Sequence, residues 1–97
     1  MKNPISNLNK VFESRIRLGI MSTLMVNDTI DFNALKELLE VTDGNLASHL
    51  KALEQAEIIT VSKKFVGRKP NTTYSATDSG REQFRRHLDA LENLLKQ

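Results

Sequence analysis

Apolar residues recur at helical spacing in four segments of the chain. The first segment, residues 10–26, carries one apolar face at steps of four residues: Phe12, Ile16, Ile20 and Leu24. A second apolar face of the same segment comprises Leu18, Met21 and Met25. Because a helix with two apolar faces must cover both, we expect it to lie centrally, or between the core and a partner. The Asn27-Asp28 pair predicts the turn that ends it.

Two shorter helices with a brief turn between them follow. Residues 29–32 predict a very short extended piece, and the second helix begins near Asp31 or Asn33, since either side chain can accept hydrogen bonds from the first free amides. Its inner stripe is Leu35, Leu38 and Leu39, and it ends near residues 40–41. The Thr42-Asp43 pair then caps a third helix with Leu46, Leu50 and Leu53 facing inward. So short a spacing between two helices is typical of a helix-turn-helix.

The second half of the chain predicts a hairpin and a long final helix. Residues 58–65 alternate and are rich in β-branched side chains, residues 66–71 predict a turn, and residues 72–76 return as a second strand. Thr77 then caps the final helix, or Ser79 and Glu82 form a capping box instead. This helix carries an apolar stripe almost to the end of the chain: Phe84, Leu88, Leu91 and Leu95.

The order of these elements predicts a mostly helical α+β fold. Helix, short strand, helix, helix and a two-stranded wing make a winged helix-turn-helix, and residues 78–96 add a C-terminal dimerisation helix. The length of 97 residues is that of one domain, 1–97. The far end of the last helix has no cover within one chain, so we expect a homodimer. The expected interface residues are Phe12, Leu88, Leu91, Leu94 and Leu95.

Composition restricts the chemistry of the chain. The absence of cysteine excludes disulfides, thiolate zinc sites and cysteine nucleophiles. No apolar run is long enough for a membrane span, and the polar start is unlike a signal peptide, so we expect a cytoplasmic protein with no membrane contact. No glycine-rich phosphate loop or Ser-His-Asp arrangement occurs, which argues against an enzyme and against a cofactor. His87 has no ligand partner at helical spacing, so we expect no metal site.

The distribution of charged residues along the chain indicates nucleic-acid binding more clearly than the net charge does. Fourteen basic and twelve acidic residues leave a net charge of only +2. Four basic residues nevertheless lie on the predicted hairpin with no acidic residue among them: Lys63, Lys64, Arg68 and Lys69. Lys63 and Lys64 should point to opposite faces of their strand. The outer face of the third helix is small and polar, which suits a DNA groove, and comprises Asn45, Ser48, His49, Ala52 and Gln55.

Four motifs resemble those of MarR- and ArsR-like winged-helix regulators, and more closely a compact single-domain subgroup of DNA-binding transcriptional regulators. In chain order they are SRIRL at residues 14–18, VTDGNLASHLKALE at 41–54, KFVGRKP at 64–70 and TDSGR at 77–81. One departure is Glu57, where the family carries glycine after the recognition helix, and we expect a local change of turn there. The resemblance implies a regulator of transcription, and repression as its effect.

The predicted DNA interface combines residues that read bases with residues that bind phosphate. In a major groove Asn45 can address an adenine edge, while Ser48 and His49 can donate to or accept from several bases. Arg68 contacts phosphate or enters a narrow minor groove. Arg15 and Arg17 either contact phosphate or are solvated at the start of their helix. The residues expected to contact the backbone or to lie on the wing are Thr42, Lys51, Lys63, Lys64, Arg68, Lys69 and Thr72.

The expected partners are double-stranded DNA and a second copy of the chain. A crevice at the dimer interface could also accept a small-molecule effector of unknown identity. The competing interpretation is a winged helix that serves as a protein-protein interaction module, with the hairpin and the last helix docked on an acidic partner. Binding to random duplex DNA at low salt separates the two, because a DNA-binding protein retains nonspecific affinity there.

Overall fold

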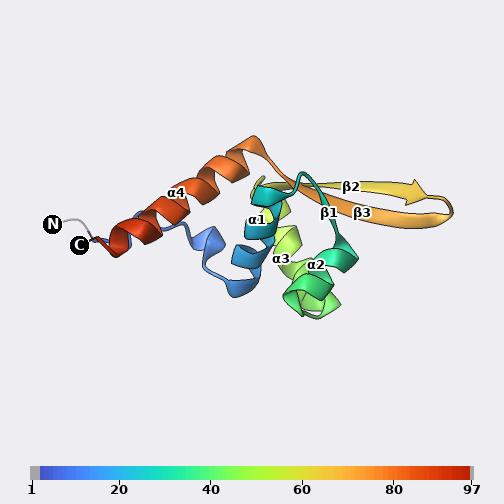
Figure 1. Ribbon diagram of the computed structural model, residues 1–97, viewed down its shortest axis with the longest axis horizontal. Helices are drawn as coiled ribbons and strands as arrows, with labels where there is room; N and C mark the ends of the chain where they lie inside the picture. The colour runs from blue at the N-terminus through green and yellow to red at the C-terminus, as the bar shows by residue number, and fades with distance from the viewer. Residues whose placement is uncertain (1–2, 97) are drawn as a thin grey trace.

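The computed structural model describes residues 3–96 and is elongated. It extends over 58 × 25 × 22 Å, because a hairpin and the last helix project in opposite directions from a small helical body (Figure 1). In chain order the elements are the 3-10 turn η1 (Lys10–Phe12), α1 (Arg15–Val26), β1 (Ile30–Asp31), α2 (Phe32–Leu39), α3 (Asp43–Gln55), β2 (Ile59–Val66), β3 (Lys69–Ala76) and α4 (Asp78–Leu94). The predicted winged helix-turn-helix with an additional C-terminal helix is confirmed.

Each of the four α-helices within residues 3–96 begins after a residue whose side-chain oxygen accepts a backbone hydrogen bond. Such a cap stabilises a helix by about 1 kcal/mol, so it determines where the helix starts. Asp31 caps α2 in preference to Asn33, and Thr77 caps α4 in place of the Ser79–Glu82 box. The first helix starts later than predicted, because Ser14 caps it and residues 10–12 form a separate turn.

The core lies where α1, α2, α3, the start of α4 and the base of the sheet meet. The predicted inner stripe of α3 is confirmed. That of α2 is wrong at Leu38, which exposes 61% of its surface, because a helix of eight residues turns only the face with Leu35 and Leu39 inward. The buried core residues are Phe12, Ile20, Met21, Leu24, Leu35, Leu46, Leu50, Leu53, Ile58, Ile59 and Phe84.

Phe12 belongs to this core and not to a dimer interface. Its ring centroid lies 5.2 Å from that of Phe84 in an edge-to-face arrangement and 5.4 Å from that of His87. The N-terminal segment folds back onto α4, where the main-chain N–H of Asn9 donates to Nδ1 of His87 over 3.0 Å. The expectation that Phe12 faces a second chain is therefore wrong, because Phe12 is fully buried in the core of its own chain, with Phe84 and His87 of α4 packed against it.

The sheet is antiparallel, with strand order β1-β3-β2. β2 and β3 pair over their whole length, and the last pair is Val66 with Lys69. The turn therefore comprises only Gly67 and Arg68, and Gly67 has the positive φ of 66° that favours glycine in so tight a turn. The prediction of a longer turn over residues 66–71 is wrong, because Lys69 and the two residues after it already belong to β3.

Pro70 lies inside a strand although proline cannot donate to a sheet. β1 pairs with β3 only at Asp31–Thr73 and Ile30–Tyr74, so β3 has a free edge at Pro70 and no backbone donor is missed there. The outer half of the hairpin consequently stands clear of the third strand. It forms the projecting wing (Figure 1).

The junction between α3 and β2 retains a left-handed backbone although no glycine occupies it. Glu57 has a φ of 59°. Its N–H donates to the carbonyl of Glu54, and the N–H of Ile58 donates to the carbonyl of Leu53. These bonds satisfy the last carbonyls of α3 as in a Schellman-type cap, which requires one left-handed residue. The expected change of turn at Glu57 is therefore wrong, because the hydrogen bonds hold the backbone in the conformation that glycine would adopt.

Candidate nucleic-acid interface

The outer face of α3 brings together the three residues predicted to read bases. The buried leucines of α3 determine which side of the helix faces away from the core. Asn45 and Ser48 are exposed on that outer side, and His49 is half-buried beside them. Lys51 is exposed one turn after Ser48. Because residues three and four apart are neighbours on a helix, these side chains form one continuous surface.

The N-terminal end of α3 is held by Thr42 and by an ion pair. Oγ1 of Thr42 accepts the main-chain N–H of Asn45 over 3.2 Å. Its hydroxyl hydrogen therefore stays available to donate to a phosphate oxygen. Nζ of Lys36 in α2 lies 2.8 Å from Oδ1 of Asp43 across the turn of the helix-turn-helix. Both partners are well exposed, so this pair orients α3 and contributes little stability.

Arg17 and His49 are joined by a hydrogen bond between α1 and α3. Nε of Arg17 donates to Nδ1 of His49 over 2.9 Å, and Nη1 of Arg17 donates to the main-chain oxygen of Val11 over 3.2 Å. Burial, and then the positive charge of Arg17, lower the pKa of His49 below its ordinary value of 6.5, so His49 is neutral at neutral pH. The interpretation of Arg17 as a freely solvated side chain is wrong, because the protein itself binds its guanidinium group.

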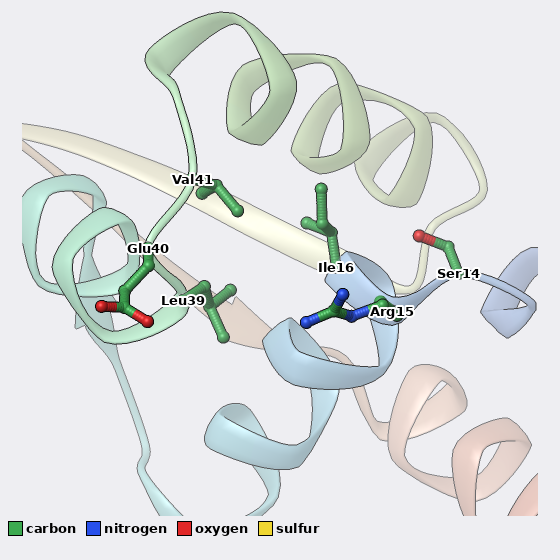
Figure 2. Close-up of a pocket in the computed structure, with 6 residues that line it drawn as sticks. All are labelled: Ser14, Arg15, Ile16, Leu39, Glu40 and Val41. Atoms are coloured by element: carbon green, nitrogen blue, oxygen red, sulfur yellow. The ribbon is translucent and has the colours of Figure 1, made fainter.

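Arg15, in contrast, is exposed and lines a pocket between the start of α1 and the α2–α3 turn. The pocket has a volume of about 520 Å³. Figure 2 shows the apolar side chains of Ile16, Leu39 and Val41 around the guanidinium group of Arg15. Ser14 and the acidic residue Glu40 complete the lining, so the pocket carries one charged side chain of each sign.

The wing carries basic side chains on both of its faces. Lys63 lies opposite Thr72, and Lys64 lies opposite Asn71. Because successive strand residues point to opposite faces, the prediction that the two lysines diverge is confirmed. Thr72 is half-buried, whereas the basic side chains are exposed: Lys63, Lys64, Arg68 and Lys69.

The wing tip also exposes two apolar side chains that the sequence pattern did not single out. Phe65 exposes 76% of its surface and Val66 exposes 65%. Their β-branched and aromatic character predicts a strand but not where the strand leaves the core. Only the length of the hairpin relative to the helical body places them at the tip, which is consequently both basic and apolar.

An exposed apolar strip comprises Leu88 and Leu91 of α4 and Leu95, the residue that follows this helix. Phe84, His87 and Ala90 face the rest of the chain. Along the adjacent side of the helix, the exposed fractions are 43% for Leu88, 36% for Leu91 and 87% for Leu95. Leu94 is half-buried. This apolar strip lies at the end of the molecule opposite to the wing (Figure 1).

The acidic residues and histidines of residues 3–96 do not cluster as metal ligands do. Those residues include no group of three or more His, Cys, Asp or Glu side chains that could hold a metal ion. His87 is only 3% exposed, and burial lowers the pKa of its imidazole, although the charge of Glu13 acts in the opposite direction. His87 is therefore a neutral core residue. None of the helices described is long and apolar enough to cross a membrane.

Family comparison accounts for this combination of recognition helix and basic wing. The family model described as "Winged helix DNA-binding domain" matches residues 16–95. The chain belongs to this winged helix DNA-binding family. Winged-helix regulators of this kind are non-enzymatic proteins that bind DNA and regulate transcription.

Two relatives and one structural neighbour are similar to this chain over most of its length. A protein of Methanocaldococcus jannaschii is 34% identical over 87 residues, which are 90% of this chain and 95% of that protein. A transcriptional regulator homologue from Pyrococcus horikoshii OT3 is 30% identical, with a TM-score of 0.82 over 89% of this chain and 85% of the other. A MarR-family chain from Enterococcus faecalis V583 is 21% identical, with a TM-score of 0.70 over 96% and 76% of the two chains, and shares the fold. The predicted MarR-like resemblance is confirmed at the level of fold, and the ArsR-like one stays a prediction.

Proposed function

We propose that this winged-helix regulator is a sequence-specific repressor that binds double-stranded DNA as a homodimer in the cytoplasm. The observation that carries the proposal is the exposed, neutral polar face of α3 beside a wing with four exposed basic residues and no acidic one. A helix of the width of α3 enters a major groove, where neutral amide and hydroxyl groups match base edges. Basic side chains at the side of that groove match the phosphates.

The residues divide into base readers and backbone binders. Asn45 addresses an adenine edge, and Ser48 and His49 contact neighbouring bases. Arg68, at the turn of the wing, contacts phosphate or enters the minor groove. Phosphate contacts set register and much of the affinity, whereas base contacts set specificity. The proposed backbone contacts are Thr42, Lys51, Lys69, Thr72 and Arg15, together with either Lys63 or Lys64, since those two lysines point to opposite faces of the wing.

The proposed dimer uses the leucine strip of α4. The single domain 1–97 contributes residues 78–96, with Leu88, Leu91, Leu94 and Leu95, to a two-fold interface. A leucine that passes from full exposure to full burial contributes about 1.5–3 kcal/mol, so Leu95 gains most of this, and the partly covered Leu88, Leu91 and Leu94 gain a fraction of it. A two-fold axis also presents two copies of α3 to half-sites about one DNA turn apart, or a multiple of it. A dimer bound over a promoter would block polymerase, hence repression.

A small-molecule effector is proposed for the pocket beside Arg15. Its volume of about 520 Å³ lies in the range of ligand sites, roughly 300–1,000 Å³. The apolar side chains beside the guanidinium group of Arg15 suit an anionic group on an apolar body, and the acidic residue Glu40 in the same lining suits a second, cationic group on that ligand. The pocket adjoins the α2–α3 turn and not the α4 interface, so a ligand there would act on the helix-turn-helix itself.

Selection of binding sites from a randomised duplex pool tests the proposed function. The wild-type chain should enrich a pseudo-palindrome whose half-sites lie about one DNA turn apart, about 10 base pairs, or a multiple of that spacing. An Asn45→Ala variant should enrich sites that lose one base preference in each half-site. If the wild-type chain enriches nothing and does not retain random duplex at low salt, the DNA-binding proposal fails and the protein-interaction module takes its place.

A further inference from the structure

The two ring nitrogens of His49 lie in different environments. Nδ1 accepts the Nε–H of Arg17 over 2.9 Å. A guanidinium group carries only donors and does not deprotonate in proteins, so Nδ1 must present a lone pair. The proton of the neutral imidazole is then on Nε2, and no hydrogen-bond partner for Nε2 occurs within residues 3–96. His49 therefore offers a free donor on the outer side of the recognition helix.

Arg17 is itself fixed before any DNA binds. Its Nη1 donates to the main-chain oxygen of Val11, and the N–H of Val11 donates to Oδ1 of Asn9 over 3.0 Å. The next residue, Phe12, is completely buried in the core. The guanidinium group is thus held between η1 and α3, and its Nε–H is aimed at His49 by bonds that do not involve DNA.

We propose that Arg17 is a positioning residue that fixes His49 as a hydrogen-bond donor toward an acceptor on a base. This inference rests on the proposed entry of α3 into a major groove. There guanine presents two acceptors, O6 and N7, adenine presents N7 and thymine presents O4, whereas cytosine presents the N4 amino donor. His49 consequently selects an acceptor, guanine foremost, and rejects cytosine at the position that it contacts.

Removal of Arg17 releases this restriction. Without the guanidinium donor, the imidazole can move its proton to Nδ1 and present Nε2 as an acceptor, which also matches the amino groups of cytosine and adenine. Discrimination at one base position should be lost, while affinity for random duplex is retained. A phosphate contact by Arg17 has the opposite signature, because its loss weakens binding to every duplex and reduces the salt slope by about one per subunit.

Nitrogen-15 NMR of the free protein tests the tautomer without DNA. In the wild type, Nδ1 of His49 should be unprotonated and Nε2 protonated, and Arg17→Met should shift both resonances toward a mixture. His87, whose Nδ1 accepts the N–H of Asn9, is an internal reference that should not change. Arg15→Met is the matched control and should leave His49 as in the wild type. A protonated Nδ1 in the wild type, or unchanged resonances in Arg17→Met, would overturn the proposal.

Binding to the selected duplex, with each base in turn at the position read by His49, tests the consequence. Cytosine should weaken wild-type binding by at least about fivefold relative to guanine. In Arg17→Met this ratio should fall below about twofold, and in a His49→Ala background Arg17→Met should change nothing further. Equal weakening on all duplexes would assign Arg17 to phosphate. If the wild type selects no site, the proposed function fails and the base-reading role with it, whereas a contrary NMR result overturns only the role of Arg17.

Discussion

Among the four glycines, Gly80 is the one at which substitution by alanine should reduce the stability of the fold most. A β-carbon there would overlap the main-chain oxygen of Ile58, which already accepts the N–H of Thr77. We expect Gly80→Ala to lower the free energy of unfolding by about 3 kcal/mol, because the backbone of one element must move. Gly44→Ala is the matched control. Apart from the chain neighbours and the backbone of its own helix, no atom lies within 4 Å of the added carbon, so this substitution should raise stability by about 0.5–1 kcal/mol.

Urea denaturation followed by circular dichroism measures both glycine variants. Both substitutions add the same methyl group to a helix. We therefore expect the difference in sign, a loss of stability in Gly80→Ala and a gain in Gly44→Ala, to result from the contact at Gly80. Equal changes in stability would mean that Gly80 is not in close contact with the backbone of Ile58, the residue before β2.

His87 makes the stability of the protein depend on pH. Because burial lowers the pKa of His87, the unfolded chain takes up a proton near pH 6.5 before the folded protein does. The folded state therefore keeps its full stability above pH 6.5 and loses stability as the pH falls below it. His49, whose pKa is also lowered, acts with the same sign. The free energy of unfolding should be smaller at about pH 5.5 than at about pH 7.5.

The variant His87→Gln identifies the group responsible. Glutamine does not titrate and can still accept the N–H of Asn9 through its side-chain oxygen. The loss of stability between the two pH values should be smaller in this variant, and smaller again when His49→Gln is added. The same loss in the wild type and in both variants would assign the pH dependence to other groups.

At the scale of elements, substitutions in α3 and substitutions in the wing should affect DNA binding in different ways. Asn45→Ala or Ser48→Ala should cost about 1–3 kcal/mol on the selected duplex and little on random DNA, since base contacts carry sequence information. Arg68→Ala and Lys69→Ala should weaken binding to both duplexes and flatten the salt slope, because phosphate contacts carry no sequence information. Fluorescence anisotropy with the two duplexes measures both effects. If Asn45→Ala weakened both duplexes equally, Asn45 would be a backbone contact.

Elements with local chemical signals at their ends could be predicted from the sequence. Asp31, Thr42 and Thr77 each precede a helix as short polar side chains that accept its first free amides. The basic residues of the wing likewise stand in a stretch without acids. In these cases the signal and the structure that it produces lie within a few residues of one another.

Features that depend on distant partners could not be predicted. Phe12 has the spacing of an apolar helical face, and the contacts of its ring with Phe84 and His87 of α4 could not be read from that spacing. The bond from Arg17 joins α1 to His49, 32 residues further along the chain. Pro70 is typical of a turn, and its place inside β3 follows from how far β1 extends. In each case packing between elements, and not local propensity, decides the outcome.

At the scale of the whole molecule, the leucine strip of α4 predicts the oligomeric state. Sedimentation of the wild-type chain at micromolar concentration should give twice the chain mass of 11.0 kDa. Leu91→Asp combined with Leu95→Asp should give a monomer, because two carboxylates per chain would have to be buried unpaired in the interface. Leu38→Asp, at an exposed leucine on α2, is the matched control and should leave the dimer intact.

The same variants connect assembly to DNA binding. The α4 double variant should lose tight binding to a two-half-site duplex but retain weak binding to one half-site, because each chain keeps its own α3 and wing. A wild-type chain that sediments as a monomer would contradict the dimer. A monomeric double variant with unchanged affinity for the full site would contradict the link between assembly and recognition.

DNA binding itself is decided by titrating the wild-type protein onto its selected duplex over a range of salt concentrations. With about three to five phosphate contacts per subunit, the logarithm of the association constant should fall linearly with the logarithm of salt, with a slope of about −5 to −9 for the dimer. An affinity that does not change with salt would contradict DNA recognition by the basic wing and α3.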